Sequence, residues 1–165
     1  MSFLLWLEST SIGTFVREGQ SLLAYPTFTV VHTIGLSIVV GISGVIAARL
    51  VGLASTVPLA PLKRLFPIIW LGFGLNLISG SGLAMASAVK TLPNAFFLTK
   101  IFCVILAVIV LRVLQVRVFR DPEVDSKPLA PMSKALGASL LVLWLIAMIA
   151  GRLIGYSVDL ISPTG

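Results

Sequence analysis

The stretch that decides the fold is LLAYPTFTVVHTIGLSIVVGISGVIAA (Leu22–Ala48), which contains no charged residue and holds His32, the only histidine of the chain. A helix rises 1.5 Å per residue, so it needs about 20 mostly apolar residues to cross a bilayer core about 30 Å thick. The composition agrees with a membrane span, because 58% of the 165 residues are hydrophobic, 11% are charged and the mean hydropathy is +1.08. We therefore expect an integral membrane protein.

Three further apolar runs follow, separated by the proline-rich joint at residues 55–67, by Pro93 and Asn94, and by the polar segment at residues 119–134. None of these joints is long enough to hold a second domain. Because an open sheet would leave backbone groups unpaired in lipid, the spans are expected to be helices. The prediction is a single all-α membrane domain over residues 1–165, a transmembrane four-helix bundle with spans at about 22–48, 65–89, 95–118 and 135–156.

The basic residues predict an orientation in the membrane. Eight of the twelve Lys and Arg residues flank the first and third loops, and four lie on the opposite side. The positive-inside rule then places both loops in the cytoplasm and both termini in the periplasm of a bacterial inner membrane, which the chain crosses several times. The net charge of +6 needs no nucleic acid as a partner, since basic cytoplasmic loops account for it.

The N-terminal segment lacks the basic start and the small-residue cleavage site of a signal peptide, so we expect it to be retained. Over residues 2–18 its apolar side chains approximate one helical face: Phe3, Leu4, Leu7, Ile12, Phe15 and Val16. This pattern predicts a short interfacial amphipathic helix anchored by Trp6, with a frayed tail or an extension of the first span as the alternative.

Ionisable and polar residues inside spans are costly, so each one is a candidate functional residue. Counting 1.5 Å per residue from the outer ends, His32 lies about 15 Å deep, Lys100 about 8 Å, Arg152 about 6 Å and Met148 about 12 Å. Asn76 lies near the middle of the second span. One imidazole and two cations from three helices thus share the outer half of the bundle, with the cations above the imidazole.

This arrangement suits haem b. A neutral imidazole can ligate iron, so His32 is the expected metal ligand, while Lys100 and Arg152 can hold the propionates. The sixth ligand stays open: Met148 could supply it, a second copy of the chain could supply it, or the iron could be five-coordinate. One His, one Cys and no membrane-embedded acid fall short of a copper or zinc site made of side chains alone.

Each of these residues also has a purely structural interpretation. His32 could form a hydrogen bond to a neighbouring helix, and Lys100 and Arg152 could extend to the interface. Met148 could fill the core, and Asn76 could join two helices. The lone Cys103 is expected to be a small packing residue.

Several pairs of small residues lie four positions apart in the spans. Such pairs can serve close packing of helices within the chain, leave room for a flat cofactor, or form the contact surface of a homo-oligomer or a larger membrane complex. These pairs are Ser37–Gly41, Gly44–Ala48, Gly82–Ala86 and Gly151–Gly155, and Gly72–Gly82 adds more glycines.

Three segments carry a resemblance: YPTFTVVHTIGLSIVVGISGVIAARLVGL (Tyr25–Leu53), NAFFLTKIFCVIL (Asn94–Leu106) and SLLVLWLIAMIAGRLIGY (Ser139–Tyr156). They resemble an uncharacterised family of small bacterial four-helix membrane proteins over nearly the whole chain. More distantly, the histidine of span one and the lysine of span three are similar to those of copper-resistance D-type and HemJ-type haem membrane domains. That resemblance implies a haem-ligand role for His32 and a supporting role for Lys100. The chain differs from haem-rich relatives in having no further histidine.

Two classes of function follow. The first is a haem-binding membrane protein for electron transfer or redox chemistry in the periplasmic half of the bundle. The second is a non-enzymatic membrane subunit or scaffold whose buried polar residues only specify helix packing. Transport is the weaker third class, because coupled transporters usually have acids within their spans, and Glu8 and Asp159 lie outside the predicted ones.

Overall fold

The structure is a computed structural model that describes residues 2–19, 24–121, 124–126 and 128–161. All regular structure in these ranges is helical, which confirms the all-α prediction. In chain order the elements are α1 (Ser2–Ser9), α2 (Ser11–Glu18), α3 (Tyr25–Val51), the 3₁₀ helix η1 (Ala60–Leu65), α4 (Phe66–Ala86), α5 (Ala88–Thr91), α6 (Ala95–Arg117) and α7 (Pro131–Ile161).

Four of these helices are long and apolar enough to cross a membrane: α3, α4 together with η1, α6, and α7. Their outward surfaces keep large apolar side chains exposed, among them Ile34, Ile78 and Phe102. Such surfaces suit lipid contact and would be unfavourable in water. The chain is therefore a multi-pass membrane protein.

The helix ends differ from the predicted spans for local reasons. The first helix begins at Tyr25 because Pro26 fits the first turn, and it continues to Val51, where Gly52 adopts a left-handed φ of 97° that suits glycine. The second helix stops at Ala86, earlier than predicted, because Ser87 leaves the helical conformation with φ of −142°. The last helix is longer than predicted, and Pro131 is its first residue.

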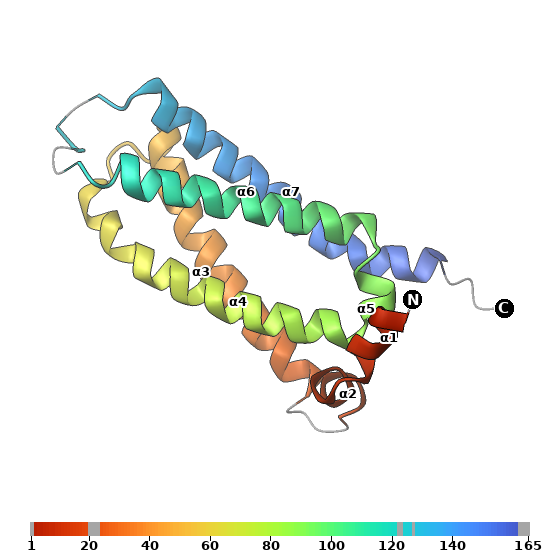
Figure 1. Cartoon of the computed structure of the whole chain (residues 1–165). Helices are drawn as coiled ribbons and strands as arrows, with labels where there is room; N and C mark the ends of the chain where they lie inside the picture. Colours follow the sequence, from red (N-terminus) through yellow and green to blue (C-terminus); the bar gives the residue numbers. More distant parts are fainter. Residues whose placement is uncertain (1, 20–23, 122–123, 127, 162–165) are drawn as a thin grey trace.

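The helices form a bundle in which α3 packs against α4 and α7, and α6 packs against α7 (Figure 1). The connections between α3 and α4 and between α6 and α7 lie at one end. The short helices α1, α2 and α5 lie at the other end, near the C-terminus of α7 (Figure 1). At the loop end, α4 also contacts α6 and the residues that follow it. The indole N–H of Trp70 donates a hydrogen bond to the side-chain oxygen of Gln115, and the Phe66 ring packs against the Phe119 ring.

Large buried side chains concentrate in the half of the bundle near these loops. The largest fully buried ones include Ile46 and Leu50 on α3, Phe66 and Ile69 on α4, Leu111 and Leu114 on α6, and Leu140 on α7. Cys103 is buried in the same core, as expected of a packing residue. In the other half the buried residues of α4 and α7 are small, among them Ser79, Ala86, Ala147 and Ala150.

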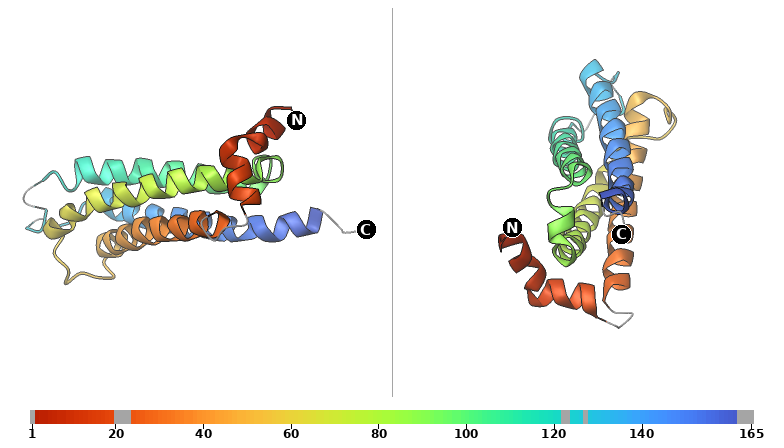
Figure 2. Two further views of the ribbon diagram at one scale, coloured as in Figure 1. Left: turned by 90° about the horizontal axis from the view of Figure 1, so that it is seen from below. Right: turned by 90° about the vertical axis from the view of Figure 1, so that its right-hand side faces the viewer.

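The segment predicted as one interfacial helix is two helices, α1 and α2, which lie across the end of the bundle at an angle to each other (Figure 2). The break falls at Thr10, whose extended backbone and side-chain hydroxyl cap the second helix by accepting from the Gly13 N–H at 3.2 Å. Threonine competes for backbone hydrogen bonds in this way, so it favours helix starts over helix interiors.

The predicted small-residue pairs divide into two groups. A Cβ atom at Gly82 would lie 2.4 Å from the Phe28 ring, and one at Gly151 would lie 3.4 Å from the Lys100 side chain, so both glycines pack within the chain. By contrast, a Cβ atom added at Gly41, Gly44 or Gly155 would have no atom of another element within 4 Å. Close helix packing within one chain therefore explains only the first group.

Candidate functional site

His32 of α3 lies against the backbone of α4. A Cβ atom at Gly80 would come within 2.9 Å of the imidazole Cε1, so only glycine at this position leaves room for the ring. One turn further along α3, a Cβ atom at Gly35 would lie 2.8 Å from the Gly72 carbonyl oxygen and 2.9 Å from the Asn76 nitrogen. Glycines on both helices thus permit the close approach that brings His32 onto α4.

His32 and Asn76 are joined by two hydrogen bonds. The Asn76 side-chain Nδ2 donates to the His32 carbonyl oxygen at 2.9 Å, and His32 Nδ1 lies 3.1 Å from the Asn76 carbonyl oxygen. Because a carbonyl oxygen only accepts, the proton of the neutral ring is on Nδ1. The Ser79 hydroxyl lies 3.2 Å from the same nitrogen and itself donates to the Leu75 carbonyl. The second ring nitrogen, Nε2, therefore carries a lone pair.

Lys100 reaches this lone pair from α6. Its Nζ lies 3.5 Å from His32 Nε2, and the aliphatic part of its side chain runs beside Gly151 of α7. Lys100 is half-buried, and it forms no ion pair within the described part of the chain. All four long helices thus meet at an imidazole whose lone pair faces a cation that has no counter-charge among the described residues. A cation in this position within a span calls for an anionic partner.

The two predicted residues of α7 lie elsewhere. Met148 is 41% exposed on the outer surface of the bundle. Arg152 is exposed as well, and its guanidinium contacts Tyr156, with 3.4 Å from NH2 to the hydroxyl and 5.4 Å from Cζ to the ring centroid. The inward surface of α7 is formed by Ala147, Ala150 and Gly151. Met148 and Arg152 have a depth in the membrane similar to that of His32, but they do not lie beside it. Both side chains are on the exposed side of α7, away from this inward surface.

The sequence therefore identified His32, Asn76 and Lys100, which the structure brings together, and missed Ser79 and Gly80. Ser79 is one turn from Asn76 on α4 and is buried, so its spacing from Asn76 was a usable signal. No group of three or more His, Cys, Asp or Glu side chains that could hold a metal ion occurs in the described ranges. Any metal at His32 would therefore have to arrive with other ligands, as iron does in haem.

Comparison with known proteins found no family model, no curated protein and no solved structure that matches this chain.

Proposed function

We propose that the protein binds haem b in the half of the bundle that carries α1 and α2, with His32 as its axial ligand, for electron transfer or redox chemistry. The observation that carries the proposal is the orientation of His32, whose Nδ1 lies 3.1 Å from the Asn76 carbonyl oxygen. Its Nδ1–H donates to the Asn76 carbonyl, which leaves Nε2 as a Lewis base. Metal-ligating histidines are usually oriented in this way, by a hydrogen bond from the other ring nitrogen to a carbonyl or carboxylate.

The residues around His32 fit the chemistry of haem in two respects. Nε2 would bind the iron, and the ammonium of Lys100, which has no ion pair among the described residues, would pair with one propionate. In the structure that ammonium faces Nε2, so haem binding requires Lys100 to exchange the imidazole for a carboxylate. Its flexible side chain runs beside Gly151, where no side chain restricts its movement.

Arg152 could pair with the second propionate only by leaving its contact with Tyr156. Because the side chain of Met148 is on the exposed surface of α7, we propose His32 as the one protein ligand to the iron. Haem held by a single imidazole supplies one-electron redox chemistry and an open coordination position. The Asn76 carbonyl and the Ser79 hydroxyl, both beside Nδ1, would orient the imidazole of His32 for this role.

The competing proposal is a membrane subunit in which this cluster only specifies helix packing. The reciprocal bonds between His32 and Asn76 favour it, because they join α3 to α4 without any cofactor. The spectrum of the purified protein separates the two proposals. Made in cells that are supplied with a haem precursor, the protein is expected to show a Soret band at about one haem per chain. A colourless protein would contradict haem binding and favour the packing role.

We also propose that the chain lies in a bacterial inner membrane with both termini in the periplasm. Supporting this, exposed Lys63, Arg64, Arg117, Arg120 and Lys134 gather at the loop end of the bundle, which the positive-inside rule places in the cytoplasm. Lys127, another of the eight cations used in the prediction, lies outside the described residues. The open surface at Gly41 and Gly44 supports a homo-oligomer through α3.

A further inference from the structure

Exposed aromatic side chains gather at the end of the bundle that carries α1 and α2. Seven aromatic side chains among the described residues are exposed, and only Phe102 of these lies well inside a span. The other six belong to this end: Phe3, Trp6, Phe15, Tyr25, Phe96 and Tyr156. Aromatic rings, above all those of Trp and Tyr, collect where lipid tails meet water. The gathering therefore indicates that a membrane interface passes through this end of the bundle.

The helix α2 runs across the direction of the long helices (Figure 2), and its side chains divide among three sides. Residues three or seven positions apart share a side of a helix. The first side is buried against the rest of the chain, the second is apolar and about half exposed, and the third is polar and exposed. In this order the pairs are Gly13 with Val16, Ile12 with Phe15, and Ser11 with Glu18. A helix that borders the bundle, lipid tails and water at once requires such a division.

The helix α1 has an inward and an outward apolar side as well. Leu4 and Leu7 are half-buried, whereas Phe3 and Trp6 are 64% and 59% exposed. The two outward rings stack on each other, with 5.8 Å between their centroids. The apolar residues that the sequence predicted as one helical face thus divide into a set that packs on the chain and a set that does not.

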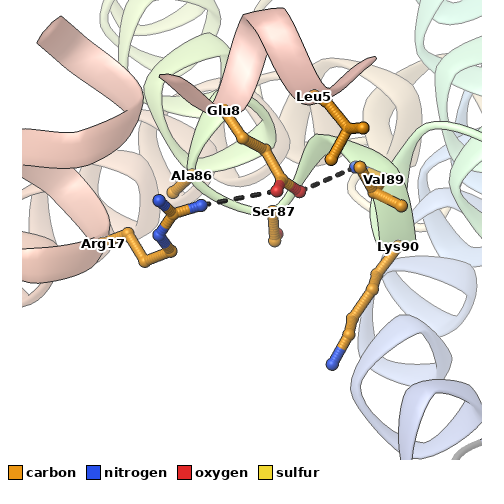
Figure 3. A pocket seen from close by; sticks show the side chains of 7 residues that line it. All are labelled: Leu5, Glu8, Arg17, Ala86, Ser87, Val89 and Lys90. Carbon is orange, nitrogen blue, oxygen red and sulfur yellow. Dashed lines mark hydrogen bonds and ion pairs between the residues drawn. The ribbon is translucent and has the colours of Figure 1, made fainter. Parts of the chain in front are cut away.

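Glu8 fixes how α1 and α2 are turned on the bundle. Figure 3 shows its carboxylate between Arg17 of α2 and Val89 of α5. One oxygen accepts from the Val89 N–H at 2.8 Å, and the other pairs with Arg17 Nη1 at 3.4 Å. Because one carboxylate joins three helices, the exposed apolar sides of α1 and α2 stay turned away from the bundle.

We propose that α1 and α2 lie in the lipid leaflet at this end of the bundle, with Phe3, Trp6, Ile12 and Phe15 inserted among the upper parts of the acyl chains. The distribution of the aromatic residues favours lipid over a second protein. They are spread over α1, α2, α3, α6 and α7, and lipid surrounds the whole bundle, whereas one partner would cover one side of it. On α3 and α6 they also continue into the apolar surface that faces lipid. This proposal does not depend on haem.

The test uses the full-length chain in lipid nanodiscs, with a nitroxide label on one introduced cysteine at a time. Ile12→Cys and Phe15→Cys report the apolar side of α2, while Ser11→Cys and Glu18→Cys are matched controls at exposed polar positions of the same helix. Collisions of the label with oxygen, which concentrates among lipid tails, are compared with collisions with a water-soluble nickel complex. Native Cys103 is buried and stays in place.

The ratio of oxygen to nickel collisions at positions 12 and 15 is expected to exceed that at positions 11 and 18. It is also expected to approach the ratio for Ile34→Cys, at an exposed position within α3. An equally low ratio at all four positions would place α2 in water and overturn the proposal, and an equally high one would overturn the interfacial placement. Labels at positions 12 and 15 that are shielded from both reagents would overturn lipid contact and indicate a protein partner, such as a second copy.

Tryptophan fluorescence checks α1 without a label. Lipids that carry bromine on the upper acyl chains are expected to quench the wild-type protein, and Trp6→Phe is expected to lose part of this quenching. Unchanged quenching in that variant would overturn the insertion of α1.

Discussion

His32 and Asn76 each donate a side-chain hydrogen bond to the backbone carbonyl of the other, across the contact between α3 and α4. The exchange fixes the register of the two helices, and it also sets the tautomer of the only imidazole in the chain. The acceptor of the ring is the Asn76 backbone, whereas the acceptor of the Asn76 amide is the His32 backbone. The packing role of the pair and its proposed role in orienting a ligand therefore depend on different atoms and can be separated by mutation.

Asn76→Ala removes the amide donor and keeps the carbonyl that orients His32. We expect the variant to lose about 1 kcal/mol of stability, the usual value of an interhelical hydrogen bond, and to keep its haem. Unfolding in mixed micelles and the Soret absorbance of the same sample measure the two effects. If Asn76→Ala lost its haem as fully as a His32 variant, the backbone carbonyl would not be what orients the ring.

Gly80→Ala is expected to displace the imidazole, because the new Cβ would lie 2.9 Å from Cε1. Overpacking of this kind costs about 1–3 kcal/mol. Gly74→Ala is the matched control on the same helix, because a Cβ atom at Gly74 would have no atom of another element within 4 Å. Alanine there is expected to leave the stability unchanged or to raise it by up to about 1 kcal/mol. Thermal unfolding compares the two variants, and similar midpoints would show that His32 does not rest on Gly80.

Asp125 joins the two loops at the other end of the molecule. Its carboxylate accepts from the Ala60 and Leu59 N–H groups at 2.9 and 2.6 Å, and these two hydrogen bonds hold the pKa of Asp125 below its ordinary value of 3.8. Because the folded state favours the charged form, the stabilisation is complete above pH 3.8 and is lost as the pH falls through the lower folded-state pKa.

Asp125→Asn is therefore expected to loosen the loops at neutral pH and to remove this part of the acid dependence. Limited proteolysis between residues 55 and 60, followed from neutral pH downward, measures both effects. An Asn variant with the same acid profile as the wild type would show that another group is responsible.

Cysteine labelling tests the orientation. Ser126→Cys, in the loop after α6, is expected to react with a membrane-impermeant thiol reagent only after the reagent is given access to the cytoplasm. Ser9→Cys, at the end of α1, is expected to react with the same reagent in cells whose inner membrane is intact. Native Cys103 is buried and provides a silent background. The reverse pattern would invert the bundle and would place the His32 cluster in the cytoplasmic half.

The sequence predicted the four helices well because each span is a long run with few charges, and few structures other than a helix can carry such a run through lipid. It also paired His32 with Lys100, since depth in a membrane follows from counting residues. It misplaced Met148 and Arg152 because residues 140–151 of α7 are apolar on all sides, so this stretch does not mark which surface faces the bundle. The contact of Asp125 with Leu59 joins loops far apart in the chain, and no local pattern announces it.

The central claim is that Nε2 of His32 ligates haem, and the Soret absorbance of His32→Gly, purified without and with added imidazole, tests it most directly. We expect wild type made with ample haem supply to show the band, the variant to lose it, and free imidazole to restore part of it by occupying the space left by the ring. Thr33→Ala, at the exposed neighbouring position, is expected to keep the band. A wild-type protein without a Soret band, or a His32→Gly variant that keeps the full band, would contradict the assignment.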